Sequence, residues 1–168
     1  MARQKFFIRG RSLWTHHPEY TGTKVRWRGA RRIERVHHTA DSGLPATATV
    51  DQEMAYLRRI EDFHMRTRGY AAIGYNYVVF ASGRVYEGRG FGKLGAHTLG
   101  HNEDVGVCFA GNFETQQPTA AALLAERQLR KRLKLHGVLL RGRIPHCSTF
   151  ATSCPGTNIR EALNLSCS

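Results

Sequence analysis

Three residues that lie far apart in the chain, His37, His146 and Cys154, have the side-chain types that hold a zinc ion. His37 follows the run 33–36 (Ile-Glu-Arg-Val), whose alternation of apolar and charged residues predicts a half-buried strand. A zinc site built from strand ends and loops collects ligands that are distant in sequence. Two imidazoles and one thiolate leave the fourth tetrahedral position open for water, which is the arrangement of a catalytic zinc site rather than a structural one.

Cys147 is the neighbouring residue that would close this site as a fourth ligand. It is adjacent to His146, and neighbouring side chains of an extended segment point to opposite faces. We therefore expect His146 and Cys147 not to reach the same ion. Isolated His and Cys residues are more often structural than metal-binding, so spacing alone leaves both interpretations open.

Two helices are predicted among the elements that must position these residues. The first runs from about Val50 to Arg68, with Thr49 as its cap, and the second from about Pro118 to His136. Spacings of three and four predict the inward face of the first helix, formed by Val50, Met54, Leu57, Ile60 and His64. We interpret His64 as a hydrogen-bonded core histidine.

Strand patterns complete the predicted fold. Residues 74–80 and 84–86 predict a hairpin, and residues 105–111 a buried strand. Residues 144–146 are a short extended piece, and residues 157–163 a small closing helix. This order of elements is typical of a single mixed α/β domain, in which helices flank a central mixed β-sheet.

The composition is that of a soluble globular protein of 168 residues, with 41% hydrophobic and 23% charged residues. Its formal net charge of +12 indicates an anionic partner, either nucleic acid, a membrane surface or an acidic polymer such as bacterial cell wall. Residues 1–30 are basic and weakly periodic, so we expect an N-terminal arm packed by Trp14, Tyr20 and Trp27. Residues 31–168 would form the domain.

No apolar run approaches the roughly 20 residues that a membrane span needs, and the first residues do not have the pattern of a secretory signal. We therefore expect synthesis in a cytoplasm. Thiols stay reduced there, so the four cysteines are expected as thiols or metal ligands rather than disulfides. Cys108 is expected in the core and Cys167 in the tail.

Across residues 33–163 the chain resembles the zinc-dependent N-acetylmuramoyl-L-alanine amidase family (amidase type 2), which includes short phage endolysins and the peptidoglycan recognition proteins. An ordered series of matching pieces supports the resemblance, although any one of them is weak. The pieces are residues 36–40 (Val-His-His-Thr-Ala), 63–65, 68–70, 73–77, 83–91, 95–98, 102, 105–107, 111–113 and 154–156 (Cys-Pro-Gly). The expected fold is accordingly a peptidoglycan recognition protein-like amidase fold.

The resemblance implies that the zinc ligands are His37, His146 and Cys154. Tyr75 matches the family's catalytic tyrosine. Thr152 occupies a position that carries Lys in some phage members and Thr in many recognition proteins. The family's usual Gly-His-Arg around the second ligand is replaced by Pro-His-Cys at residues 145–147, so the setting of His146 departs from the family pattern.

The resemblance also implies a substrate groove. His97 and Asn102 match groove residues that contact glycan and peptide, and His38 would be an orienting or groove residue. An alternative for Tyr75 is that it fills the core as a strand aromatic, because aromatic residues are frequent in buried strands.

The implied reaction is hydrolysis of the amide between the lactyl group of N-acetylmuramic acid and L-alanine in bacterial peptidoglycan. Zinc would polarise the lactyl carbonyl and lower the pKa of its bound water to about 7. Tyr75 would orient the water or donate to the oxyanion, and Thr152 would add a hydrogen bond. A phage-type endolysin of this kind would be a monomer that stays in the host cytoplasm until a holin releases it.

Two alternative functions remain at this point. A non-catalytic peptidoglycan recognition protein keeps the groove and commonly loses the cysteine ligand, whereas the chain retains all three candidate ligands and Tyr75. A nucleic-acid binder is suggested by charge and by Arg26-Trp27-Arg28, but it leaves the ordered motifs unexplained, so no nucleic acid is expected as partner. The basic surface would instead bind anionic wall polymers or outer-membrane phosphates.

Overall fold

The computed structural model describes residues 6–167, which form one six-stranded sheet flanked by helices. The order in the sheet is β1-β4-β3-β5-β2-β6. β3 and β4 pair antiparallel as a hairpin, and the other paired strands are parallel, which confirms the predicted mixed sheet. The strands are β1 (Ile8–Arg9), β2 (Arg31–His38), β3 (Tyr77–Val79), β4 (Val85–Glu87), β5 (Val105–Phe109) and β6 (Leu139–Pro145).

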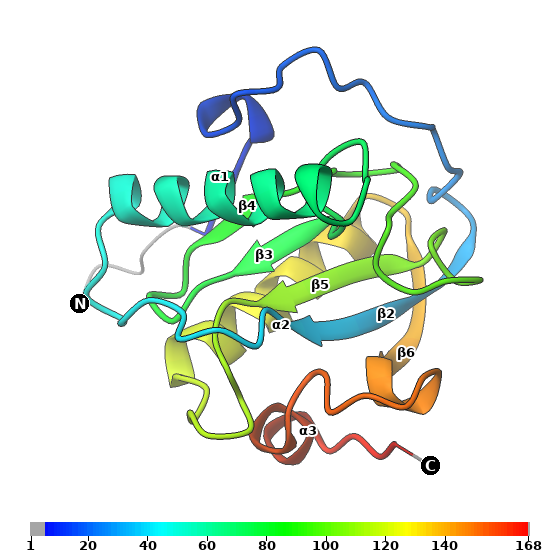
Figure 1. Cartoon of the computed structure of the whole chain (residues 1–168). Coiled ribbons are helices and arrows are strands. Elements are labelled where there is room, and N and C mark those ends of the chain that lie inside the picture. Colours follow the sequence, from blue (N-terminus) through cyan, green and yellow to red (C-terminus); the bar gives the residue numbers. More distant parts are fainter. Residues whose placement is uncertain (1–5, 168) are drawn as a thin grey trace.

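Helices cover both faces of this sheet. The three helices are α1 (Val50–Arg66), α2 (Ala120–Leu135) and α3 (Thr157–Leu163). α1 lies on one face, and α2 lies behind the sheet on the opposite face (Figure 1). Each of these two helices packs into its own apolar cluster, one with Tyr56 and Leu57 of α1 and the other with Leu129 and Leu133 of α2. Within the described residues no helix is long and apolar enough to cross a membrane.

α1 begins where the sequence predicts. Thr49 Oγ1 accepts the N–H of Gln52, and the Gln52 side chain accepts the N–H of Thr49, so the capping box satisfies backbone donors that a helix start leaves free. The predicted inward face is partly wrong, because Glu53 and Glu61 are also buried. Their burial is possible because Glu53 pairs with Arg84 and Glu61 pairs with Arg11.

Three strands and the start of α2 differ from the prediction. β3 is shorter than the predicted strand over residues 74–80. The short extended piece predicted at residues 144–146 is the end of the longer strand β6, which pairs with β2. The strand β1 was not predicted, because two residues carry no measurable periodicity. α2 starts after the cap Thr119, so Pro118 lies before the helix rather than in its first turn.

The N-terminal segment packs on the sheet from its described start at residue 6. β1 pairs parallel with β4. As predicted, Trp14 and Trp27 are packing residues: both are buried, and their indole N–H groups donate to the carbonyl oxygens of Glu87 and Glu103. Residues 1–5 of the predicted arm lie outside the described residues, and a domain boundary near residue 30 stays a prediction.

Candidate metal centre

The parallel pairing of β2 with β6 brings the two predicted histidine ligands together. The carboxyl ends of parallel strands meet at the same edge of a sheet, and ligand sites form there. β2 ends with His37 and His38, and Val36 of β2 lies opposite Pro145 at the end of β6. His146 comes directly after Pro145 in a short 3-10 turn. The His37 and His146 rings are 4.6 Å apart, centroid to centroid.

A loop after this turn brings in the third predicted ligand, Cys154. Its carbonyl oxygen accepts the N–H of Cys147, and its Sγ accepts the backbone N–H of His38 at 3.4 Å. The Sγ lies 3.7 Å from His37 Nδ1. Donor atoms of His37, His146 and Cys154 all lie within 4.8 Å of one another.

This donor set fits zinc. Typical zinc–nitrogen and zinc–sulfur bonds in a tetrahedron place the two donor atoms about 3.6 Å apart, close to the separation of His37 Nδ1 and Cys154 Sγ. Burial lowers the pKa values of His37 and His146, and neighbouring positive charges such as Arg35 lower them further. Both imidazoles are therefore neutral near pH 7, so each has a ring nitrogen lone pair to offer a cation.

A chain of hydrogen bonds behind the centre joins His37 to His97 through the hydroxyl of Thr98. His37 Nε2 lies 3.2 Å from the Thr98 hydroxyl, and that hydroxyl lies 3.1 Å from His97 Nδ1. If His37 Nε2–H donates to Thr98, and Thr98 O–H donates to His97 Nδ1, then His37 Nδ1 is left unprotonated toward Cys154. Partners of this kind fix the orientation and tautomer of metal-binding histidines.

His97, predicted as a groove residue, lines the cavity next to this centre and is tightly held. Burial lowers its pKa to about 3, so it is neutral. A Cβ on Gly95 or Gly106 would lie 2.2 or 2.3 Å from the ring carbon Cδ2 of His97, so only glycine leaves room for the imidazole. Asn102, also predicted in the groove, does not line this cavity: its Oδ1 accepts the N–H groups of His97 and Thr98.

Tyr75 lies at the cavity wall, where it would be needed for catalysis. It precedes β3, and its ring is 5.5 Å from that of His37 and 5.4 Å from that of His64. Tyr75 is half-buried, and burial raises the pKa of its phenol well above 10. The phenol is therefore protonated at neutral pH, and Tyr75 also packs against the apolar cluster of α1, beside the buried Cys108.

His38 and Thr152 also line the cavity. His38 Nδ1 accepts the backbone N–H of Phe113 at 3.2 Å, so this ring nitrogen is not free to bind a metal ion. Thr152 Oγ1 accepts the backbone N–H of Cys154 at 3.2 Å. The Thr152 hydroxyl therefore positions the ligand loop and keeps its own proton to donate. The catalytic and binding roles of His38, Tyr75, His97, Asn102 and Thr152 stay predictions.

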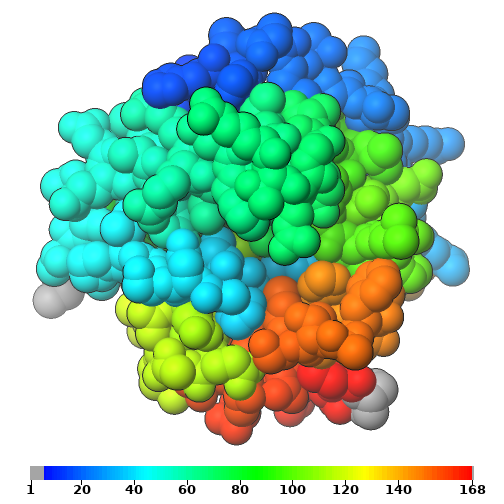
Figure 2. All heavy atoms as spheres, viewed as in Figure 1, coloured from blue at the N-terminus to red at the C-terminus, as the bar shows by residue number. Residues whose placement is uncertain are grey.

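The cavity has a volume of about 340 Å³ and extends from the three ligands along α1. In Figure 2 the end of α1, the segment after β2 and the C-terminal loop meet around a hollow. Several residues of the cavity wall have no groove role predicted from the sequence. Residues 63–65 and 68–70 are nevertheless among the pieces that match the family. These additional lining residues are Ile60, Phe63, His64, Arg68 and Tyr70.

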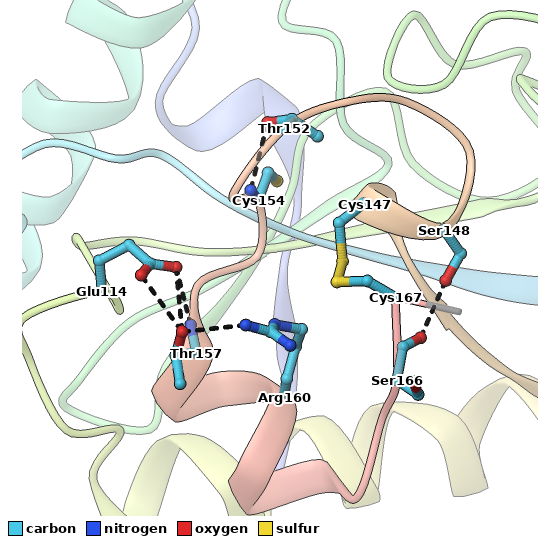
Figure 3. Close-up of a disulfide and its surroundings, with 9 residues drawn as sticks. All are labelled: Glu114, Cys147, Ser148, Thr152, Cys154, Thr157, Arg160, Ser166 and Cys167. Atoms are coloured by element: carbon cyan, nitrogen blue, oxygen red, sulfur yellow. Dashed lines mark hydrogen bonds between the residues drawn. A yellow bond between two sulfur atoms is a disulfide. The ribbon is translucent and has the colours of Figure 1, made fainter.

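The cysteine prediction needs one correction. Cys147 and Cys167 form a disulfide, so the expectation of free thiols is wrong for this pair, whereas Cys108 and Cys154 are free and buried. The tail returns from α3 to the turn that carries His146, where Ser148 Oγ also donates to the carbonyl oxygen of Ser166 (Figure 3). The disulfide removes Cys147 as a ligand, which agrees with the prediction that His146 and Cys147 do not share an ion.

The comparison with family models gives a match to N-acetylmuramoyl-L-alanine amidase over residues 32–157. The chain belongs to this amidase family. The family resemblance seen in the sequence is thereby confirmed, and so is the predicted fold.

Relatives of this amidase-family chain include both recognition proteins and a named amidase. Peptidoglycan-recognition protein SC2 of Drosophila simulans is 36% identical over 127 residues, which are 74% of this chain and 67% of that protein. A human N-acetylmuramoyl-L-alanine amidase is 38% identical over 132 residues, which are 76% of this chain and 23% of that enzyme.

A solved relative has the same fold. The structure of peptidoglycan recognition protein-LE in complex with tracheal cytotoxin, a monomeric diaminopimelic acid-type peptidoglycan, is 31% identical. It superimposes with a TM-score of 0.83 and covers 94% of this chain and 92% of that chain. The amidase-family fold described above is therefore one that binds a peptidoglycan fragment in this relative.

Proposed function

We propose that the protein is a zinc-dependent N-acetylmuramoyl-L-alanine amidase, which hydrolyses the amide between N-acetylmuramic acid and L-alanine in bacterial peptidoglycan. The observation that carries this proposal is the convergence of His37, His146 and Cys154 at one end of a groove that also contains Tyr75. Family membership supports the reaction class, and the presence of all three ligands favours catalysis over recognition alone.

The chain's own residues would supply positioning and hydrogen bonds. Zinc held by the three ligands would polarise the scissile carbonyl and lower the pKa of a water molecule, so that the water can lose a proton and attack near neutral pH. Tyr75, which is protonated, would donate its phenolic proton in a hydrogen bond to the oxygen that gains charge in the transition state. Thr152 would donate a further hydrogen bond from the ligand loop, without the positive charge of a lysine at that position.

The groove beyond the ligands would hold the stem peptide. Its wall combines apolar and aromatic groups from α1 with the exposed guanidinium of Arg68, which suits a peptide that carries carboxylates. The complex of the solved relative with a peptidoglycan fragment supports this choice of partner.

The phage endolysin role and holin-dependent release are part of the proposal. The substrate lies outside the cytoplasmic membrane, so the enzyme must work there. A disulfide such as Cys147–Cys167 persists in that oxidising environment, which supports an extracytoplasmic site of action.

The test is release of new L-alanine amino termini from purified peptidoglycan. We expect activity that chelation abolishes and zinc restores, and that is lost in Cys154→Ser and His146→Ala. His16→Ala is the matched control, because His16 is exposed in the N-terminal segment and outside the groove. Binding of peptidoglycan with no new amino termini at any zinc concentration would contradict the amidase proposal and assign a recognition role.

A further inference from the structure

We propose that the exposed side of α2 is a docking surface for anionic lipid headgroups, and that it holds the enzyme with its groove facing away from the membrane. The docking surface is defined here as Leu124, Arg127, Lys131, Arg132, Lys134 and Leu135, all exposed. The orienting effect, but not the lipid binding itself, rests on the proposed amidase function.

The positive charge of the docking surface is uncompensated within its helix. α2 contains one acidic residue, Glu126, which is buried and pairs with Arg143 of β6 at 2.8 Å. Among the described residues, Lys131, Arg132 and Lys134 have no ion-pair partner in the structure. Such a face attracts an anionic surface, and each Lys or Arg near anionic lipids adds about 1 kcal/mol of binding free energy.

Exposed leucines on the same side favour lipid over a hydrophilic polymer. Leu124 and Leu135 are 53% and 74% exposed. At 3.6 residues per turn they project in nearly the same direction as Lys131, with Arg127 and Lys134 on one flank and Arg132 on the other. Leu124 and Leu135 lie about three turns apart, with Lys131 between them. Exposed leucines among cations are typical of helices that lie at a membrane interface, because the leucines enter the acyl boundary while the long basic side chains reach the headgroups.

The position of α2 in the fold gives this surface a direction. α2 packs on the sheet face opposite α1, whereas the groove is lined by α1 and by the ends of β2 and β6 (Figure 1). A molecule seated on a membrane through α2 would therefore present its groove to the side away from the lipid. In a cell envelope that is the side on which peptidoglycan lies.

The test is binding of the full chain to phosphatidylcholine vesicles that contain about one third phosphatidylglycerol, measured by co-sedimentation. We expect Lys131→Glu with Lys134→Glu to weaken binding by about 30-fold or more, and Leu124→Ser with Leu135→Ser to weaken it by about tenfold. The matched control is Arg59→Glu with Arg66→Glu, which changes the net charge equally on the exposed side of α1. The control pair should bind nearly as well as the wild type.

Three results would overturn the inference. Equal losses in the control pair would mean that net charge, and not α2, determines binding. Unchanged binding of the leucine pair would mean that the leucines do not enter the lipid and that the surface recognises negative charge alone. Unchanged binding of the lysine pair would exclude the surface altogether. Cleavage of soluble peptidoglycan fragments should be unaltered in every variant, so a failure of the amidase proposal would appear there and not in the vesicle assay.

Discussion

At the scale of single residues, the protonation state of Tyr75 decides which catalytic role this residue could have. Its phenol pKa is raised well above 10 by burial, so it cannot act as a base near neutral pH. Replacing Tyr75 with Phe removes the donor and leaves the ring that packs against His37 and His64. We expect kcat to fall about 100-fold or more in Tyr75→Phe, as for loss of one oxyanion donor.

The control for this prediction is zinc binding, which Tyr75→Phe should leave unchanged because Tyr75 is not a ligand. Steady-state kinetics on muropeptides, with zinc content measured on the same samples, checks both expectations. A normal kcat in a zinc-loaded Tyr75→Phe protein would support the alternative that Tyr75 only fills the core.

Thr98 lies where its hydroxyl would hold His37 in the tautomer that a metal ligand needs. Thr98→Val keeps the side-chain shape but removes the hydroxyl between His37 Nε2 and His97 Nδ1. We expect zinc affinity to fall about 10-fold to 100-fold, the usual effect of losing such a partner. Competition with a chromophoric chelator measures this affinity. Thr98→Ser should restore the affinity, and equal affinities of wild type and Thr98→Val would refute the role.

At the scale of elements, the centre depends on how three segments end beside one another. β2 ends at the histidine pair, and β6 ends at the turn that carries His146. The loop to Cys154 then leads into α3, whose tail returns to the same turn and is joined to it by the Cys147–Cys167 disulfide. The disulfide therefore closes a loop that contains the candidate ligand Cys154, and it is anchored at the residue next to His146.

Opening this loop should loosen the metal centre. We expect Cys147→Ser with Cys167→Ser to lower the free energy of unfolding by about 3 kcal/mol, the chain-entropy value for a loop of this length. Zinc should also dissociate faster, because His146 is adjacent to the bridge. Urea unfolding and zinc release kinetics test these two effects, and reduction of the wild type with a dithiol should reproduce them. Unfolding midpoints that do not change on reduction would contradict the prediction.

At the scale of the whole molecule, buried neutral histidines make stability depend on pH. His64 is buried, its Nδ1 accepts the N–H of Gly74, and burial lowers its pKa to about 4. This folded-state pKa lies below the unfolded value of about 6.5, so its contribution to stability is complete above pH 6.5. As pH falls from 6.5 toward 4, up to about 3 kcal/mol is lost.

His64→Asn isolates this contribution, because the Asn oxygen can accept the same N–H and does not titrate. We expect the loss of stability between neutral pH and pH 4.5 to be smaller in His64→Asn than in the wild type. Urea unfolding at several pH values gives the two curves. Parallel curves would show that His64 does not titrate as its burial implies.

The net charge of +12 also acts at the scale of the molecule. If it attracts the enzyme to anionic envelope components, lysis of whole cells should fall steeply as salt rises, because screening shortens the range of the attraction. Cleavage of small soluble muropeptides is the control and should change little. Lysis that is equally fast at low and high salt would rule out this role for the charge.

The sequence by itself determined the features that rest on local patterns or on residue type. The capping box of α1, the hairpin of β3 and β4 and the buried strand β5 follow from spacing within a few residues. The three candidate ligands His37, His146 and Cys154 follow from donor chemistry together with an ordered family resemblance, and the structure brings them together.

Only the tertiary structure decided what depends on partners far along the chain. The tertiary features are the strand β1, the length of β6, the Cys147–Cys167 disulfide and the contact of His37 with Thr98. Each needs a neighbour that no local period specifies. The burial of Glu53 has the same cause, because a charged residue can face inward only where Arg84 meets it across the fold. Local periodicity encodes which face of an element is apolar, and long-range packing decides which polar groups find partners there.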